Sequence, residues 1–389
     1  MNPEQFGTRA GEVKNSRNGA YYTFTPESLP VQVSVDNEML KLLEEVTLKL
    51  GNLNGIGKQL SNPYLLIDPF LKKEAVMSSK IEGTQSSLSD VLLFEAKEEP
   101  VENAHGDLQE VINFVLATED GIKRIRSEEI SLTLILDLHR QLLQGVRGKE
   151  KNPGAIRKVQ NWIGREGSTL VDARYVPPEP EKVEPLLDNL FSFINKNQEL
   201  PELIKIGLAH YQFEAIHPFR DGNGRIGRLL ILLYLLKRKI LDLPLLYISE
   251  YFEHNRENYY DLLLRVSQKG DYEAWLKFFL KGIAIKSDDA TVKITRLLKY
   301  MQDETKEIED NCGVSGMKIF RRLFTNPYIT ISRAAKATDI GYPTAERAMM
   351  KMVDLKILKL VTKQKRNRVF VCEEIVNIIT AGFPETEPG

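Results

Sequence analysis

The segment HPFRDGNGRIGRLL, residues 217–230, restricts the fold more than any other part of the chain. Gly222, Gly224 and Gly227 have the G-x-G-x-x-G spacing of a dinucleotide-binding turn, and Asp242 lies at about the distance of a ribose-binding acid. That turn requires a buried strand directly before it. The preceding residues, IGLAHYQFEAIHPFRD, instead contain charges, two histidines and apolar residues at helical spacing. We therefore expect a loop between two helices, and the dinucleotide fold is disfavoured.

Helical periodicity dominates the chain from Asn37 onward, so we expect a mostly α fold. Residues before about 35 are polar, contain Pro and Gly, and predict an extended arm. Residues 154–178 place apolar side chains around GREGS, which predicts a β-hairpin between helices. The expected helices begin at 37 and at Asp68-Pro69 and then span 108–126, 132–144, 181–196, 202–215, 224–239, 255–268 and 272 to about 310.

The pattern changes after Gly313 to three short helices and two short strands with a basic tip. This order is typical of a winged helix-turn-helix module, with its turn at residues 339–342. Between Gly316 and Cys372 there are 13 Lys and Arg against 3 Asp and Glu, a net charge of +10, which leaves −11 for the rest of a chain of net charge −1. We expect four regions: an N-terminal arm and helical region (1–105), a helical core (106–286), a linking helix (287–313) and the C-terminal module (314–389).

Composition restricts the cellular setting. Two distant cysteines, Cys312 and Cys372, favour a reducing compartment and exclude a disulfide framework. The first residues, MNPEQFGTRAGEVKN, have no apolar core typical of a secretory signal, and the longest apolar run is too short for a membrane span. We expect a soluble cytoplasmic protein with no membrane partner.

The loop and the helix after it have the features of an anion site. Gly222 and Gly224 let the backbone turn sharply, and the first N–H groups of the helix then point toward a ligand. Asn223 is expected to turn its amide toward the same place. Arg225 and Arg228 oppose the helix dipole on one face of the first turn, which is tolerated where a di- or triphosphate binds.

Two further residues of the segment predict chemistry at this site. Asp221 supplies one hard oxygen ligand, as suits a Mg²⁺ ion held by few carboxylates and by phosphate oxygens. His217 lies upstream of the turn, where a neutral imidazole could accept a proton from a hydroxyl group.

The string HPFRDGNGRIGR matches the HxFx(D/E)GNGRxxR signature that defines Fic domains. The strings NPGAIRKVQNWIG, YVPPEPEKVEPLLDNL and YISEYFEHNRENYYDLL also resemble segments of this family, so the similarity covers roughly residues 37–286. The resemblance implies a Fic-type helical bundle with a β-hairpin flap. It also implies transfer of AMP from ATP to a protein hydroxyl of Ser, Thr or Tyr, the enzyme's own included.

The resemblance also assigns roles by position. It makes His217 the general base and Asp221 the Mg²⁺ ligand, and Arg228 the contact of the γ-phosphate. The remaining implied residues contact the nucleotide phosphates, line the adenine pocket or form the flap that aligns the target by strand addition. The phosphate residues are Gly222, Asn223, Gly224 and Arg225, the adenine residues are Asn255, Tyr259 and Tyr260, and the flap residues are Ile163, Gly164, Tyr175 and Val176.

A second match lies upstream, in MSSKIEGTQSS. Ser78 and Glu82 fit the (S/T)xxxE(G/N) inhibitory helix of Fic proteins, and their spacing places both on one helix face. The resemblance implies that Glu82 pairs with Arg228 and occupies the space of the γ-phosphate. In some relatives the same glutamate supports removal of AMP, and this alternative stays open.

Other functions remain possible from the residues alone. The C-terminal module could bind DNA through residues 343–355 and the basic tip, or could dock a protein or a second copy of the chain. The core could be a nucleotide sensor of a transcriptional regulator, although a sensor has no need of His217. The motif also does not separate ATP from UMP, GMP or phosphocholine donors.

Overall fold

Helices make up most of the regular structure, with two small antiparallel sheets beside them. The computed structural model describes residues 1–16, 19–59, 64–100, 104–146, 148, 150–165, 167–196, 199–362 and 367–382. The helices are α1 (Asn37–Gln59), α2 (Tyr64–Ile81), α3 (Leu88–Ala96), α4 (Asp107–Arg124), α5 (Leu132–Leu142), α6 (Pro180–Asn195), α7 (Glu202–Ile216), α8 (Asn223–Lys237), α9 (Ser249–His254), α10 (Arg256–Lys269), α11 (Tyr272–Leu323), α12 (Ile331–Thr338), α13 (Tyr342–Asp354) and α14 (Glu373–Thr380). The strands are β1 (Gly11–Asn15), β2 (Tyr22–Pro26), β3 (Tyr328–Thr330), β4 (Lys359–Leu360) and β5 (Val369–Val371), and a 3-10 helix spans Pro3–Gln5.

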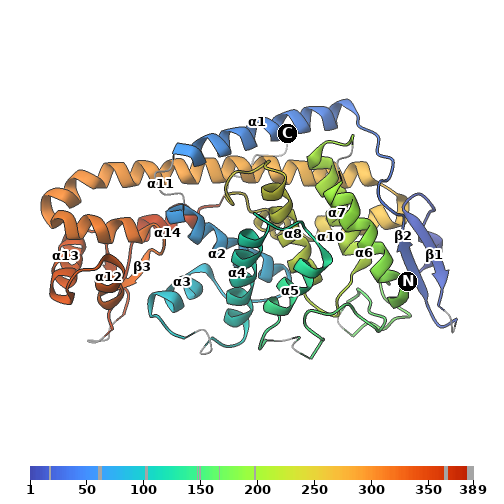
Figure 1. Ribbon diagram of the computed structural model, residues 1–389, viewed down its shortest axis with the longest axis horizontal. Coiled ribbons are helices and arrows are strands. Elements are labelled where there is room, and N and C mark those ends of the chain that lie inside the picture. The colour runs from blue at the N-terminus through green and yellow to red at the C-terminus, as the bar shows by residue number, and fades with distance from the viewer. Residues whose placement is uncertain are drawn as a thin grey trace.

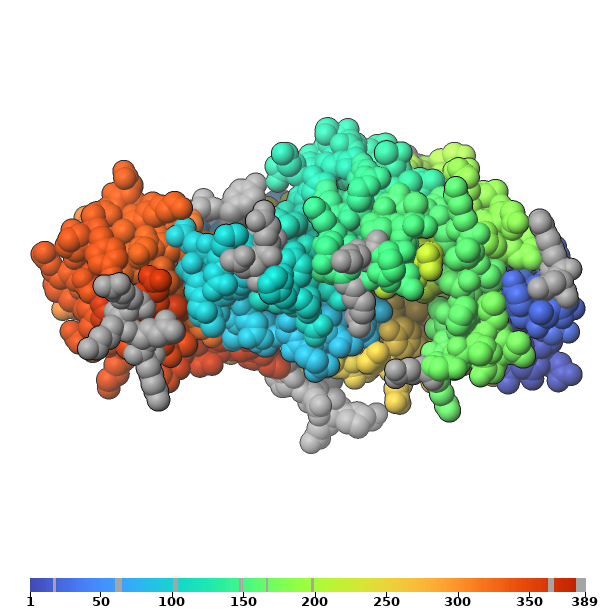
Figure 2. Space-filling model, turned by 90° about the horizontal axis from the view of Figure 1, so that it is seen from below, coloured from blue at the N-terminus to red at the C-terminus, as the bar shows by residue number. Residues whose placement is uncertain are grey.

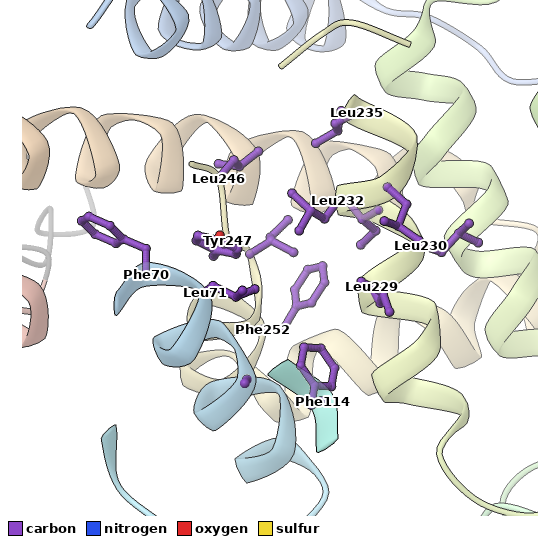
Figure 3. Packing of buried hydrophobic residues seen from close by; sticks show 14 of the residues in the cluster. Phe70, Leu71, Phe114, Leu229, Leu230, Leu232, Leu235, Leu246, Tyr247 and Phe252 are labelled. Carbon is purple, nitrogen blue, oxygen red and sulfur yellow. The ribbon is translucent and has the colours of Figure 1, made fainter. Parts of the chain in front are cut away.

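Helix α8 is buried on all sides from Arg225 to Leu235, as is typical of a helix surrounded by other helices. Figure 3 shows its leucines among Leu71 of α2, Phe114 of α4 and Phe252 of α9. Helix α7, which precedes the loop, is also buried along almost its whole length. The loop between α7 and α8 is therefore anchored in the core at both ends.

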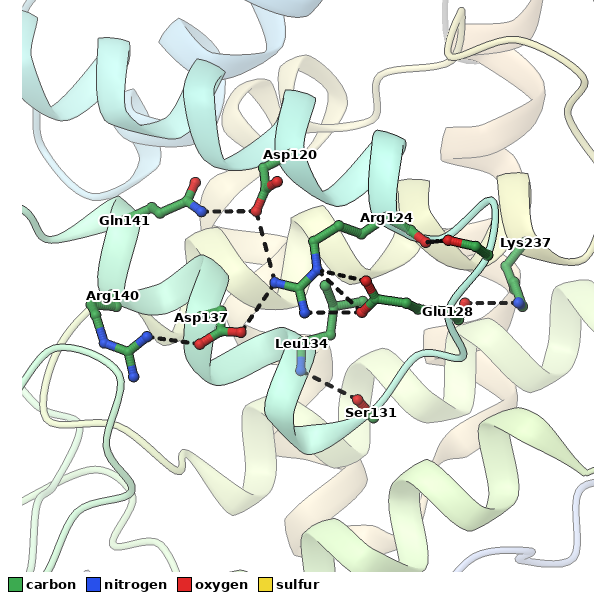
Figure 4. A network of polar contacts seen from close by, with 10 residues as sticks. Asp120, Arg124, Glu128, Ser131, Leu134, Asp137, Arg140, Gln141 and Lys237 are labelled. Atoms are coloured by element: carbon green, nitrogen blue, oxygen red, sulfur yellow. Dashed lines mark hydrogen bonds and ion pairs between the residues drawn. The ribbon is translucent and has the colours of Figure 1, made fainter.

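A polar network joins α4 to α5 and to the end of α8 (Figure 4). Arg124 of α4 donates to Glu128 at 2.9 Å and to Asp137 of α5 at 3.1 Å. The ammonium of Lys237 at the end of α8 donates to the backbone carbonyl of Glu128 at 2.7 Å. Helix α4 is thus fixed relative to α8.

Helix α11 runs for 52 residues, and α1 lies along it (Figure 1). Gly313 has φ 64° and ψ −162°, so two helices join there at a kink. The predicted linking helix, 287–313, is therefore no separate element, because it continues the helix that begins at Tyr272. Its predicted end falls at the kink.

The described residues after the kink form four helical segments, namely the end of α11 and the helices α12, α13 and α14, and a small sheet of order β3-β5-β4. Phe370 of β5 pairs with Ile329 of β3 and with Leu360 of β4, both antiparallel. The turn between α12 and α13 lies at residues 339–341, close to its predicted place. Strand β3 and helix α14 are additions to the expected order. The predicted basic tip, residues 363–366, lies outside the described residues.

The N-terminal region differs from the predicted extended arm, because β1 and β2 form an antiparallel hairpin. Phe24 of β2 is buried, and its N–H donates to the carbonyl of Val176 at 2.9 Å. The amide of Gln212 on α7 donates to the carbonyl of Glu27 at 2.9 Å. The hairpin is short and depends on these contacts with distant residues, so the local pattern alone did not predict it.

Helix α2 begins at Tyr64 and contains Pro69, so the predicted helix start at Asp68-Pro69 was wrong.

Within the described ranges, no helix combines the length and the apolar character that crossing a membrane requires.

Candidate active site

The loop between α7 and α8 turns sharply at both of its ends. His217 ends α7 in the left-handed conformation, with φ 51°, and its N–H donates to the carbonyl of Phe213 at 3.0 Å. Gly222 has φ 77° and precedes the first residue of α8. A Cβ on Gly222 would lie 3.2 Å from the side chain of Leu142, so both conformation and space favour glycine.

One ring nitrogen of His217 forms a hydrogen bond within the protein, and the other is available to accept a proton. Nδ1 lies 3.3 Å from the carbonyl oxygen of Glu214, and because a carbonyl only accepts, Nδ1 carries the proton. Nε2 is then the unprotonated nitrogen, and it has no hydrogen bond among the described residues. Burial, and secondarily the charge of Arg157, lowers the pKa of His217 to about 4. The imidazole is therefore neutral at physiological pH, as a general base must be.

A buried arginine that the sequence analysis missed holds the loop in place. Arg157 is 2% exposed, and its guanidinium donates to the backbone carbonyls of His217 at 2.9 Å and Pro178 at 2.5 Å. The amide of Asn161 donates to the carbonyl of Phe219 at 2.8 Å. These bonds satisfy the carbonyls of an irregular segment that has no secondary-structure partners. Arg157 lies in NPGAIRKVQNWIG, but nothing local indicates its partners.

Asn223 and His139 complete the support of the loop. The Asn223 amide accepts from the Phe219 N–H at 2.8 Å and donates to the Phe219 carbonyl at 2.9 Å, so it closes the loop instead of turning toward a ligand as predicted. His139 stacks on Phe219 with ring centroids 3.7 Å apart. Its Nε2 donates to the carbonyl of Asp221 at 3.0 Å, and its Nδ1 accepts from the N–H of Gly154. His139 was also missed by the sequence analysis.

The two arginines of the motif have different environments. Arg225 is 1% exposed and pairs with Glu110 of α4 at 3.0 Å and with Asp221 at 3.5 Å. Its charge is thus neutralised beside the loop, and it does not share one ligand-facing surface with Arg228 as expected. Glu110, on the helix that the polar network fixes, was not predicted to take part.

Arg228 contacts both residues of the predicted inhibitory segment. Its Nε donates to Ser78 Oγ at 2.9 Å, and its Nη2 donates to the Ser78 carbonyl and to Glu82 Oε1, both at 2.8 Å. Nη1 of Arg228 is buried without a partner among the described residues. Ser78 lies in the last turn of α2, and Glu82 lies in the turn just after it.

Glu82 lies over the N-terminus of α8. A Cβ on Gly224 would be 2.4 Å from Glu82 Oε1 and 2.8 Å from Arg228 Nη1. The first N–H groups of any α-helix lack intrahelical partners, so this end of α8 favours negative charge. The carboxylate of Glu82 thus occupies the place where the sequence predicts a phosphate group.

The residues present fit a Mg²⁺ ion that arrives with a nucleotide. Asp221 Oδ1 accepts from the N–H of Gly222 at 2.6 Å, and the side chain is 32% exposed. The described residues contain no group of three or more His, Cys, Asp or Glu that could hold a metal alone. One carboxylate suits Mg²⁺ because this ion keeps water and phosphate oxygens as its other ligands.

The three residues expected at the adenine pocket lie in different environments. Tyr259 is 1% exposed and bonds His210 Nε2 through its hydroxyl at 2.9 Å, so it belongs to the core and its predicted place in the pocket was wrong. Tyr260 is half-buried and close enough to Glu82 and Arg228 for their charges to affect its pKa. Asn255 directly precedes α10, and its side-chain amide donates to the carbonyl of Tyr251 on α9.

The flap is a single antiparallel bridge rather than the predicted hairpin of two strands. Ile163 and Tyr175 exchange two backbone hydrogen bonds of 2.8 and 3.0 Å. Tyr175 is buried and its hydroxyl donates to the carbonyl of Ala215 at 2.7 Å, and Val176 is buried as well. Ile163 and Gly164 are exposed. The long-range contact of Tyr175 takes the place of the two-stranded ladder that the apolar residues around GREGS predicted.

Glu214 is a further buried acid that the sequence analysis missed. Its Oε1 has no hydrogen-bond partner among the described residues, and a Cβ on Gly227 would lie 2.1 Å from it. Burial, and secondarily the charge of Glu82, raises the pKa of Glu214 to about 8, although Arg228 opposes the shift. Glu214 therefore holds a proton at neutral pH.

The chain is similar in sequence to proteins named protein adenylyltransferase Fic. A protein adenylyltransferase Fic of Aedes aegypti is 31% identical over 174 residues, which cover 43% of this chain and 31% of that protein. One of Nematostella vectensis is 27% identical over 207 residues, which cover 51% of this chain and 44% of that protein. The chain thus spans less than half the length of these curated relatives.

Solved structures and family profiles extend the comparison. A Fic family protein of Desulfovibrio desulfuricans G20 has a TM-score of 0.57 at 19% identity, covering 87% of this chain and 97% of that one. A Fic domain containing signaling protein of Bacteroides thetaiotaomicron has a TM-score of 0.52 at 19% identity, covering 64% and 97%. The Fic/DOC family profile matches residues 129–235, and the Fic/DOC family N-terminal profile matches residues 40–123. The chain belongs to the Fic/DOC family.

Proposed function

We propose that the protein is an adenylyltransferase that transfers AMP from ATP to a hydroxyl group of a target protein, its own chain included. The observation that carries the proposal is the unprotonated Nε2 of a neutral His217 beside the helix N-terminus that Arg228 flanks. The curated relatives, which are named protein adenylyltransferases, support the same chemistry.

The transfer needs one proton acceptor and one site for negative charge. The target hydroxyl gives its proton to Nε2 of His217, and its oxygen forms a bond to the α-phosphorus. The bond between the α-phosphorus and the bridging oxygen breaks, and pyrophosphate leaves. The N–H groups at the start of α8 and the guanidinium of Arg228 stabilise the phosphate charge, so the protein contributes mainly positioning and electrostatics.

Other residues bind and orient the reactants. Asp221 would hold a Mg²⁺ ion, which supplies charge neutralisation of the phosphates when bound. Tyr260 is the best placed aromatic side chain for the adenine ring, and Ile163 and Gly164 are accessible for a target segment. We place the reaction in the cytoplasm, where ATP is available and both cysteines, which are free, stay reduced.

Glu82 inhibits this reaction in the proposed mechanism. It neutralises Arg228 and covers Gly224, so the γ-phosphate and the carboxylate compete for one position. Two negatively charged groups cannot share this position, because like charges in close contact repel each other strongly where little water screens them. In this proposal the arrangement with Glu82 on Arg228 is the inhibited form, and displacement of Glu82 precedes productive binding of ATP.

The proposal is tested by incubating the protein with Mg²⁺ and ATP, UTP, GTP or CTP, each labelled at the α-phosphate, or with phosphocholine-labelled CDP-choline. Glu82→Gly should incorporate more label from ATP than wild type, and Glu82→Gly combined with His217→Ala should incorporate none. Label from another donor would change the substrate. No label from any donor in Glu82→Gly would exclude the transferase activity.

A further inference from the structure

The turn that carries Glu82 lies between two helices that both contact the C-terminal module, residues 314–362 and 367–382. Helix α2 ends just before Glu82, and α3 begins at Leu88. Figure 2 shows the module, in orange, directly against the cyan surface that includes α3. The position of the turn therefore depends on how these helices are held.

A chain of buried and half-buried charges joins α2, α3 and the module. Lys72 of α2 is 5% exposed and donates to Asp68 at 2.6 Å and to Glu95 of α3 at 2.5 Å. Glu95 in turn accepts from Arg333 of α12 at 2.8 Å and from Asn326 at 2.9 Å. Burial alone would raise the pKa of Glu95, but Lys72 and Arg333 keep it below its ordinary value. One carboxylate thus connects three elements.

Other contacts add to this junction. The amide of Asn326 donates to the Leu92 carbonyl of α3 at 3.0 Å, and the Tyr328 hydroxyl donates to Ser89 Oγ at 3.1 Å. Lys73 of α2 donates to the carbonyl of Ile379 on α14 at 3.1 Å. The module therefore contacts helices on both sides of the inhibitory turn through polar groups.

The junction is incompletely packed. A cavity of about 520 Å³ lies between α2, α3, α4 and the module, and its lining includes Lys72, Glu95, Leu116, Arg333 and Lys336. Interfaces between domains that are held by polar contacts separate more readily than apolar cores do. Polar contacts and this cavity thus make up a large part of the junction beside α3.

Opposite charges of the module and of the rest of the chain pair with each other at this junction. The segment from Gly316 to Cys372, which makes up most of the module and has a net charge of +10, meets an acidic body. Arg333 pairs with Glu95, and the exposed Lys336 pairs with Glu98 at 3.2 Å. Part of the positive charge that suggested an external partner is therefore neutralised by Glu95 of α3 and by Glu98, which follows this helix.

We propose that the C-terminal module restrains the inhibitory turn: while the module is docked on α2 and α3, Glu82 stays on Arg228, and undocking frees Glu82. The consequence of undocking, which is that ATP can bind, rests on the proposed function. The restraint on Glu82 is a property of the fold and does not depend on that function. A signal received by the module would reach the active site along α2 and α3.

Hydrogen–deuterium exchange on the full chain tests the restraint directly. Arg333→Glu places two carboxylates together and should speed amide exchange at residues 79–86 by roughly 10- to 100-fold, the loss expected for charge-assisted hydrogen bonds. Lys336→Glu repels Glu98 at an exposed position and should act in the same direction. Arg321→Glu is the matched control, because Arg321 is an exposed cation of the module with no ion pair in the described part of the chain. Exchange in α8 serves as the reference for global unfolding.

The outcomes separate the restraint from the activity. Faster exchange at 79–86 in Arg333→Glu and Lys336→Glu, with more self-labelling from ATP than in Arg321→Glu, supports the proposal. Wild-type exchange at 79–86 in both variants overturns it. If Arg333→Glu speeds exchange in α8 too, it has unfolded and Lys336→Glu alone decides. If Glu82→Gly takes no label, the proposed function fails while the exchange result still decides the restraint.

Discussion

Glu82 and Arg228 are 146 residues apart in the sequence, yet Oε1 of one accepts from Nη2 of the other at 2.8 Å. Burial would raise the pKa of Glu82, but Arg228 holds it below its ordinary value of 4.5. A carboxyl with a lowered pKa contributes stability above its unfolded value that is lost as the pH falls through the folded value. The contact is therefore fully charged at neutral pH and weakens only in acid.

Removing this carboxylate should strengthen nucleotide binding. Glu82→Gly frees Arg228 and the N-terminus of α8, so the affinity for Mg²⁺–ATP should rise at least roughly tenfold, because hydrogen bonds to charged groups contribute about 1.5–3 kcal/mol. Calorimetric titration measures it in a His217→Ala background that prevents turnover. Glu199→Gly, an exposed control, should bind as the parent does. Equal affinity in Glu82→Gly and the control would show that Glu82 does not compete with the nucleotide.

Arg157 should hold the loop because its planar guanidinium reaches several carbonyls at once, and not only because it is positively charged. Arg157→Lys keeps a cation but cannot reach the carbonyls of His217 and Pro178 together. We expect a loss of about 3 kcal/mol in the free energy of unfolding and a larger loss of transferase activity. Denaturant unfolding and labelling assays check both. The exposed flap variant Arg165→Lys is the control, and equal behaviour of the two variants would contradict the assigned role.

The sequence predicts those parts of the site that depend on neighbouring residues. The turn at Gly222 follows from its conformational freedom, and the helix after Gly224 follows from apolar spacing, so α7, the loop and α8 were predicted closely. The spacing of Ser78 and Glu82 correctly indicates two neighbouring side chains, but the predicted shared helix is wrong for Glu82, because α2 ends at Ile81. Each of these features is set within about two helical turns.

The rest of the site depends on pairs of residues that are distant in the sequence. Arg225 meets Glu110 across 115 positions, and Arg157 meets His217 across 60. No local pattern distinguishes these side chains from exposed charges. The same limit applies to Arg333, whose charge suggested an external partner until its contact with Glu95 was seen.

The pKa of His217 gives a pH prediction. Because burial lowers it to about 4, the neutral ring is favoured in the folded protein. Its contribution to stability is fully present above the unfolded value of about 6.5 and is lost as the pH falls toward 4. NMR titration of ring-labelled histidine should show a midpoint near pH 4 for the signal that disappears in His217→Ala. A midpoint near 6.5 would contradict the buried, neutral base.

Glu214 should make the fold less stable as the pH rises. Its pKa is raised from 4.5 to about 8, chiefly by burial, so between these values the unfolded chain has released a proton that the folded chain keeps. Stability is then lost across this window at up to about 1.4 kcal/mol per pH unit. Glu214→Gln removes this slope, because glutamine fills the same space and does not ionise. Denaturant unfolding at pH 6 and pH 8 should show a smaller fall for Glu214→Gln than for wild type, whereas the exposed Glu199→Gln should match wild type. Parallel losses in all three proteins would mean that the pKa of Glu214 is not raised in the folded protein.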